Sequence, residues 1–225
     1  MPLPITIKRH NVTDRDLQKA VDLFFNHADW KGLYLTGGTC LAEFYFGHRT
    51  SIDIDLFTKD RELFVRAGQV LSQPDFFPFG RLEPRRKFPE FQDFLIIRPD
   101  RPAIKVDVVL DIPVALGEKI SFESIWLDSL EDIVSNKIGC LINRNEVKDY
   151  LDLYYLIPEI KKSIGELLEL GLQKDAGVDP LVVAHQMTFI QSIKTSPDIF
   201  LANVPWQHVL DYFSRLHDEI LDTLT

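Results

Sequence analysis

Apolar and polar residues alternate most clearly around two closely spaced aspartates. Ile52, Ile54 and Leu56 fall on one face of an extended chain, and Asp53 and Asp55 fall on the other. This two-residue period is typical of a β-strand with one buried face. The pattern predicts a strand that presents two carboxylates on the same polar face.

Other short segments also have the composition of strands. Residues 32–36, 91–98 and 103–110 are largely apolar, and a Pro-Asp-Arg-Pro turn separates the last two. Residues 73–81 contain three phenylalanines and two prolines and are expected to begin a further strand pair. Together these segments predict a sheet in the first half of the chain.

Helical periodicity, with apolar residues three and four positions apart, covers most of the remainder. A helix is expected between Gly38 and Gly47, and a capping box from Ser129 to Asp132 is expected to open another. One helix is expected to end before Pro158, because proline cannot continue the hydrogen-bond ladder. The other predicted helices cover residues 13–27, 60–71, 181–193 and 205–224.

The order of these elements predicts an α+β fold in two parts. Residues 1–118 are expected to form a mixed sheet flanked by helices. Residues 119–225 are expected to form a helical bundle, and the character of the sequence changes between residues 112 and 128.

Composition narrows the class of protein. The 225 residues are 45% hydrophobic with a net charge of −9, as in an ordinary globular protein. No apolar run is long enough for a membrane span, and the first ten residues lack the apolar core of a signal peptide, so we expect a cytoplasmic protein. Cys40 and Cys140 lie in apolar helical patterns and are expected to be reduced.

The acidic surplus argues against non-specific coating of nucleic acid, so any contact with nucleic acid should be local. One segment, residues 81–87 with the sequence RLEPRRK, could provide it. The same segment could equally be a solvated loop or hairpin tip.

Three carboxylates are candidate metal ligands. Asp107 interrupts an apolar strand, and burying a lone aspartate is costly unless it is paired. If its strand neighbours the one that holds Asp53 and Asp55, the three carboxylates could bind Mg²⁺ or Mn²⁺. Taken alone, the Asp-x-Asp pattern also fits an exposed polar face on an edge strand.

A glycine pair adds a candidate phosphate site. Gly37, Gly38 and Thr39 lie between a predicted strand and a predicted helix. Glycine allows a close approach of the backbone, and a helix start offers free N–H groups to phosphate. The Thr39 hydroxyl could add a further donor to phosphate. A tight turn would need the same glycines. The order of strand, Gly-Gly-Thr, helix, Asp-x-Asp strand and Asp strand nevertheless indicates an NTP-type site.

The helical half contributes further charged candidates. Lys137 falls on the apolar stripe of its helix, where it either extends past core residues to solvent or reaches into a cleft. Asp149 and Asp152 lie on one flank of the next helix. They could form an exposed patch in which Lys148 pairs with Asp152. Alternatively, Asp152 could act as a general base or as the partner of Lys137.

Two stretches resemble a known family. Residues 35–57, LTGGTCLAEFYFGHRTSIDIDLF, are similar to the first motif block of the AbiEii/AbiGii nucleotidyltransferase toxins, which have the polymerase-beta-like nucleotidyltransferase fold. Lys137, Arg144 and residues 148–154, KDYLDLY, resemble the family's helical motifs. With Asp107 the likeness spans residues 35–156.

The resemblance implies roles for the matching residues. A nucleotidyltransferase-type sheet would hold an NTP and a divalent metal. The triphosphate would be held by Gly37, Gly38 and Thr39, and the nucleotide or the acidic strand would be supported by Arg49 and Ser51. Mg²⁺ or Mn²⁺ would be bound by Asp53, Asp55 and Asp107. Lys137 would contact phosphates, and Asp152 would be the catalytic residue of the second domain.

Three functions remain open at this point. The resemblance favours transfer of NMP from NTP to an acceptor by the toxin of a toxin–antitoxin or phage-defence pair with an antitoxin partner. RNA, at the tRNA end, is the acceptor that the resemblance implies. A nucleotidyltransferase could instead act on a small molecule, such as an aminoglycoside, or on a protein. The chain could also be a non-catalytic nucleotide-binding module, although three intact carboxylates argue against decay.

Overall fold

The computed structural model describes residues 5–224, so the first four residues of the N-terminal stretch and Thr225 lie outside the described part. The chain divides into two compact units. We call them the sheet unit, Met1–Pro113 with Glu118–Asp128, and the helical unit, Val114–Gly117 with Ser129–Thr225. This division corrects the predicted boundary after residue 118, because the residues that follow it form two strands of the sheet.

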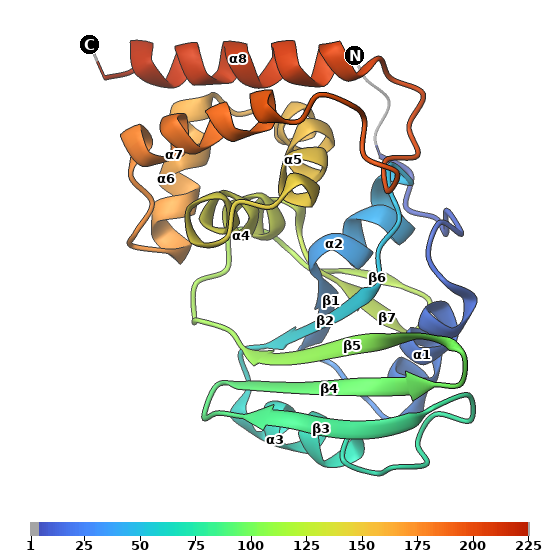
Figure 1. Ribbon diagram of the computed structural model, residues 1–225. Helices are drawn as coiled ribbons and strands as arrows, with labels where there is room; N and C mark the ends of the chain where they lie inside the picture. Colours follow the sequence, from blue (N-terminus) through green and yellow to red (C-terminus); the bar gives the residue numbers. More distant parts are fainter. Residues whose placement is uncertain (1–4, 225) are drawn as a thin grey trace. The chain divides into compact units, whose positions relative to one another are not determined.

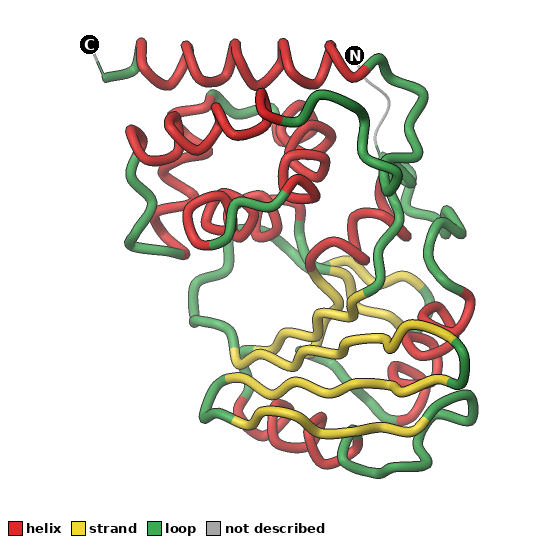
Figure 2. The backbone as a smooth tube through the Cα atoms, viewed as in Figure 1, coloured by secondary structure: helices red, strands yellow, loops and turns green. Residues whose placement is uncertain are grey.

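A mixed seven-stranded sheet forms the centre of the sheet unit (Figures 1 and 2). Its strand order is β3-β4-β5-β2-β1-β7-β6, with parallel pairing between β2 and β5 and between β1 and β7. The other neighbours are antiparallel. The strands are β1 Leu33–Thr36, β2 Asp53–Thr58, β3 Arg81–Lys87, β4 Phe91–Arg98, β5 Arg101–Leu110, β6 Ile120–Phe122 and β7 Ile125–Leu127.

The two faces of the sheet differ in polarity. Ile54, Leu56, Val106 and Val108 are buried on one face, where helices α1 (Arg15–His27) and α3 (Arg61–Val70) pack against the strands. Helix α1 buries the predicted stripe of Leu17, Val21, Phe24 and Phe25. The opposite face of β2 and β5 carries the carboxylates, because successive side chains of a strand alternate between faces.

A short helical segment connects β1 to β2. Helix α2 (Gly37–Cys40) continues into a π-helix, η1 (Leu41–Phe46), and Gly47 ends it with a left-handed backbone at φ 65°. The predicted helix is therefore confirmed in position. Apolar residues spaced three and four positions apart predicted an ordinary α-helix and did not reveal the wider π-turns. Buried Glu43 in this segment accepts the Thr13 hydroxyl at 2.8 Å and backbone N–H groups of residues 11–13.

Three local predictions were wrong. Ile52 is 62% exposed because β2 begins one residue later, at Asp53. Residues 73–81 form a loop up to the start of β3, so the strand lies at the basic residues 81–87 themselves. The strands β6 and β7 were missed because each has only three residues.

The helical unit buries a separate apolar core around Tyr150 and Phe213. Ser129 caps its first helix by accepting the Asp132 N–H, as the capping box predicts. The second helix continues past Pro158 and ends at Ile160, so the predicted end before the proline was wrong. Its helices are α4 Leu130–Asn143, α5 Val147–Ile160, α6 Ile164–Lys174, α7 Pro180–Met187, the 3₁₀ turn η2 Thr188–Ser192 and α8 Trp206–Asp222. Across residues 5–224, no helix has the length and apolar character needed to cross a membrane.

Candidate functional site

Two glycines allow side chains to lie directly against the backbone at the end of β1. Gly37 has a left-handed φ of 68°, and a Cβ atom there would come within 2.2 Å of Asp55 Oδ2. A Cβ atom on Gly38 would come within 2.1 Å of Arg49 Nη2. The predicted close approach is therefore present, and it places Asp55 and buried Arg49 at the predicted phosphate turn.

Two buried hydroxyls tie this turn to the start of β2. The Thr39 hydroxyl donates to the backbone carbonyl of Asp53 and lies 2.9 Å from Ser51 Oγ. Ser51 itself contacts Thr39, so whether it supports the acidic strand or the nucleotide stays a prediction. This contact differs from the predicted role of the Thr39 hydroxyl, which faces the protein, so only the Thr39 backbone stays a candidate for phosphate.

The strand register brings the predicted carboxylates together. Strands β2 and β5 are neighbours, and Asp55 and Asp107 are Cα partners across them. Asp53 lies on the same face two residues earlier, paired in register with Lys105. Thr36 of β1 is the partner of Asp55 on its other side. The expectation that the two acidic strands adjoin is confirmed.

Asp107 lies in an unusual environment for a carboxylate. It is 9% exposed, and its Oδ1 atom is buried without a hydrogen-bond partner among the described residues. Its Oδ2 atom accepts from Lys105 Nζ at 2.5 Å. Burial raises the pKa of Asp107, the Lys105 ammonium opposes this rise, and the charges of Asp93 and Asp53 add to it. Asp107 therefore keeps one carboxylate oxygen outside its ion pair with Lys105, and burial outweighs that pair in raising its pKa.

The donor set fits Mg²⁺ or Mn²⁺ by chemistry. Asp53, Asp55 and Asp107 supply hard carboxylate oxygens from two adjacent strands, and Asp107 Oδ1 has a free lone pair for an ion. As the side chains stand, no three His, Cys, Asp or Glu residues within the described range converge closely enough to hold a metal. The fit is therefore one of donor type and strand position.

Asp93 of β4 belongs to the same row and was not predicted. It is the Cα partner of Asp107 and is fully buried. The hydrogen bond from Arg86 lowers the pKa of Asp93, against the effect of burial. An aspartate within the apolar sequence Phe-Gln-Asp-Phe-Leu-Ile-Ile gives the same signal that identified Asp107, so the sequence could have revealed it.

A second unpredicted carboxylate closes the other end of the row. Asp128 follows β7 and is 1% exposed. It accepts from the Thr36 hydroxyl at 2.6 Å and from Lys119 Nζ at 2.5 Å. The Lys119 ammonium also lies over the Tyr34 ring, 4.3 Å from its centroid. Asp128 was missed because its hairpin was assigned to the helical part.

Within the helical unit, the predicted lysine and aspartates form one buried ionic cluster. Lys137 Nζ donates to Asp149 Oδ1 at 2.9 Å and contacts Asp152 Oδ2 at 2.5 Å. Arg144 forms a two-pronged contact with Asp149 at 2.9 and 2.7 Å. The pairing of Lys137 with Asp152 is confirmed. The exposed-patch alternative is wrong, because both aspartates are fully buried.

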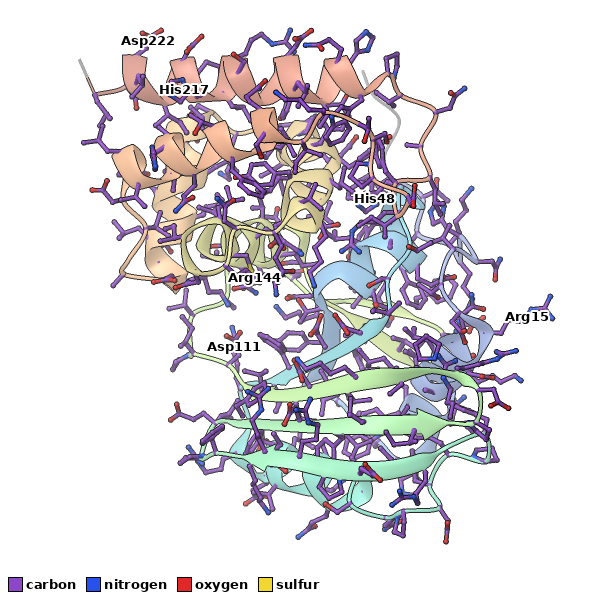
Figure 3. All side chains as sticks on the ribbon, viewed as in Figure 1. Arg15, His48, Asp111, Arg144, His217 and Asp222 are labelled. Atoms are coloured by element: carbon purple, nitrogen blue, oxygen red, sulfur yellow. The ribbon has the colours of Figure 1, made fainter. Side chains whose placement is uncertain are left out.

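The charges in this cluster stabilise one another. Burial would raise the pKa of Asp149, but the hydrogen bond from Arg144 and the charge of Lys137 outweigh it and lower the value. The hydrogen bond to Asp149 raises the pKa of Arg144, which is partly exposed at the end of α4 (Figure 3). Two cations thus balance two carboxylates inside the helical unit.

The two cysteines differ in burial. Neither Cys40 nor Cys140 forms a disulfide within the described residues, in agreement with the prediction that both are reduced. Cys40 is fully buried, and burial raises its pKa well above the usual value. Cys140 is only partly buried, which differs from the expected core position.

Known proteins share this architecture. An uncharacterised protein of Aquifex aeolicus is 26% identical over 84% of this chain and 88% of its own length. A Helicobacter pylori protein assigned as a nucleotidyltransferase superposes with a TM-score of 0.61 at 16% identity, covering 92% of this chain and 94% of that one. MenT4, a nucleotidyltransferase toxin of Mycobacterium tuberculosis, superposes with a TM-score of 0.57 at 12% identity, covering 91% and 81%. These structures share the fold.

The family itself is established by sequence. The model of the nucleotidyl transferase AbiEii toxin family, a type IV toxin–antitoxin system, matches residues 22–178. That range contains the glycine turn, the row of carboxylates and the ionic cluster of the helical unit. The chain is therefore a member of the AbiEii nucleotidyltransferase toxin family.

Proposed function

We propose that this protein is a metal-dependent nucleotidyltransferase that transfers NMP from an NTP to RNA, at the tRNA end, as a toxin held in check by an antitoxin. One observation carries the proposal. Asp55 and Asp107 are register partners on adjacent parallel strands, and Asp55 lies against the Gly37 turn. The backbone proposed to bind phosphate and the carboxylates proposed to bind metal thus adjoin in one unit.

The residues of the sheet unit would have separate roles in binding phosphate, metal and the acidic strand. Gly37 and Gly38 let Asp55 and Arg49 lie directly against the turn, and the backbone N–H groups of the turn would contact the triphosphate. Thr39 and Ser51 hold the acidic strand in place. Asp53, Asp55 and Asp107 would hold Mg²⁺ or Mn²⁺, which supplies Lewis-acid chemistry and neutralises the charge of the departing pyrophosphate.

The proposed transfer is a single displacement at phosphorus. The RNA hydroxyl oxygen forms a bond to the α-phosphorus of the NTP, and the bond from that phosphorus to the bridging oxygen of the β-phosphate breaks. Pyrophosphate leaves with the electron pair, and the proton of the hydroxyl passes to water. The chain's part is to orient the two reactants and to compensate charge.

The proposal keeps the roles that the family resemblance gives to the helical unit. Lys137 would contact phosphate, and Asp152 would be the catalytic carboxylate of this unit. In the structure, Lys137 and Asp152 form an ion pair with each other. Lys137→Met and Asp152→Asn should each lower the melting temperature, because each removes one partner of a buried ion pair. Each should also lower transfer at temperatures where the melting curve still shows a folded protein.

Radiolabel transfer tests the proposal. Each α-labelled NTP is incubated with total bacterial RNA and Mg²⁺, and wild type is compared with Asp55→Asn, which has nearly the same shape. Label in RNA that disappears in the variant and after EDTA treatment supports the proposal. Nucleotide binding without labelled RNA would contradict the RNA acceptor, and label on a small molecule or protein would replace it. Circular dichroism confirms that the variant is folded.

A further inference from the structure

The β3–β4 hairpin differs in charge from the rest of the chain. Strand β3, residues 81–87, has four basic residues and one acidic residue, whereas the whole protein carries a net charge of −9. The strand lies at the edge of the sheet, next to β4 alone (Figure 1). A local positive edge of this kind attracts a polyanion without making the whole surface basic.

The hairpin shares its face with the carboxylates. Arg86 is the Cα partner of Asp93, Asp93 is the partner of Asp107, and Asp107 is the partner of Asp55. Register partners on adjacent strands project to the same side of a sheet. Since neighbouring strands are about 4.8 Å apart, the backbone of Arg86 lies about 10 Å from that of Asp107.

Arg86 is fixed in position yet open to solvent. Its side chain is 52% exposed, while Asp93 is fully buried beneath it. The guanidinium donates to Asp93 Oδ2 through Nε at 3.1 Å and Nη2 at 2.7 Å, and the Arg86 backbone N–H donates to Oδ1 at 2.8 Å. A bulge between Pro84 and Arg86 permits this contact. An exposed cation with little freedom suits recognition of phosphate.

Aromatic rings continue this surface at the hairpin tip. Phe88 is 54% exposed, and its ring lies nearly parallel to that of Phe91, with centroids 6.5 Å apart. The Arg86 guanidinium lies 5.5 Å from the centroid of the Phe91 ring. Two backbone hydrogen bonds hold the tip. The Phe88 N–H donates to the Phe91 carbonyl at 2.7 Å, and the Leu110 N–H donates to the Glu90 carbonyl at 2.9 Å.

We infer that the β3–β4 hairpin is the docking platform for the single-stranded end of the acceptor RNA. Unpaired bases stack on exposed aromatic rings, which tolerate any base, and a neighbouring arginine holds the backbone phosphate. Phe88 offers the exposed ring and Arg86 the fixed cation, on the carboxylate face of the sheet. The inference rests on the proposed function, because it assigns the acceptor site of the same reaction.

Binding of a labelled oligonucleotide tests the platform without catalysis. Fluorescence anisotropy is recorded with a single-stranded RNA and with the same RNA as a duplex. Phe88→Ala should weaken binding of the single strand about tenfold, Phe88→Leu should weaken it similarly, and Phe88→Tyr should restore it, because only an aromatic ring stacks. The duplex should bind less tightly than the single strand to wild type.

A salt series tests the cation. Arg86→Met combined with Asp93→Asn removes both charges, so no buried carboxylate is left alone. This double variant should reduce the slope of log affinity against log salt by about one. Arg15, which projects from α1 into open solvent, is the matched control, and Arg15→Ala should leave the slope unchanged (Figure 3).

Two results would overturn the platform: unchanged affinity in Phe88→Ala, or full affinity in Phe88→Leu. An unchanged slope in the double variant would overturn the role of Arg86.

Transfer assays separate this inference from the proposed function. If wild type labels RNA but Phe88→Ala keeps the same acceptor KM, the function holds and the platform fails. If the variants lose binding but wild type transfers nothing, the platform holds and the function fails. The KM for NTP should not change in any variant.

Discussion

Three glycine-to-alanine substitutions separate the cost to stability from the cost to activity. At Gly37, alanine must adopt a left-handed backbone at φ 68°, which costs about 1–2 kcal/mol. Its Cβ would also lie 2.2 Å from Asp55 Oδ2, but Asp55 is only partly buried and its carboxylate can turn away. We therefore expect Gly37→Ala to remain folded and to lose transfer, because Asp55 is displaced.

At Gly38 the obstacle cannot turn away. The new Cβ would lie 2.1 Å from Nη2 and 3.1 Å from Cζ of Arg49, which is 3% exposed and donates to the Thr50 carbonyl at 2.8 Å. Overpacking costs about 1–3 kcal/mol, and loss of a hydrogen bond to a charged donor adds about 1.5–3 kcal/mol. The expected loss is about 3–5 kcal/mol, which is larger than at Gly37.

Gly165 is the matched control, because a Cβ there meets no atom within 4 Å among the described residues. It lies inside helix α6, so alanine should stabilise by about 0.5–1 kcal/mol. Urea denaturation measures the free energy of unfolding, and label transfer measures activity. The reasoning is refuted if Gly37→Ala retains full activity, or if Gly38→Ala costs less stability than Gly37→Ala.

Three further predictions concern single carboxylates. Asp107→Asn should lower transfer at least about 100-fold, because a charged metal ligand stabilises the transition state by several kcal/mol. It should shift the melting temperature little, since the ion-pair partner Lys105 is one-third exposed. The pKa of Asp149 is lower in the folded protein than its unfolded value of 3.8, so its ionised form stabilises the fold. This stabilisation is present above pH 3.8 and is lost as the pH falls through the lower folded pKa. Urea midpoints between about pH 5 and 2 should therefore fall more steeply for wild type than for Asp149→Asn. Glu43→Gln should lower stability by about 1–3 kcal/mol in urea denaturation. It should leave transfer unchanged, because the partners of Glu43 are residues 11–13 and no member of the row of carboxylates.

The sequence was sufficient to predict the centre of the sheet. Alternation identified the strand that holds Asp53 and Asp55, and the isolated charge of Asp107 identified its neighbour. These signals are local, and each depends on a strand of at least six residues. The three-residue strands β6 and β7 carry no measurable period, so the boundary between the two units was misplaced.

Other parts of the candidate site depend on contacts that no local pattern encodes. Asp93 and Arg86 are seven residues apart, but their pairing requires the bulge at Pro84. The Thr39 hydroxyl looked available for phosphate because the sequence does not show that it turns toward the Asp53 carbonyl. Periodicity gives the face on which a side chain lies, whereas its partner is set by register and by bulges.

The distribution of charge is compatible with the proposed RNA acceptor, although the chain as a whole is acidic. The helical unit has 15 acidic and 8 basic side chains, a net of −7, whereas the sheet unit is close to neutral at −2. The acidic surplus is therefore largely absent from the unit that holds the carboxylate row and the basic hairpin. A few phosphate contacts at Arg86 and its neighbours would give binding with a shallow dependence on salt, unlike that of a protein that coats nucleic acid. A steep dependence in wild type would require many more basic contacts than strand β3 provides, and would place the RNA on another surface.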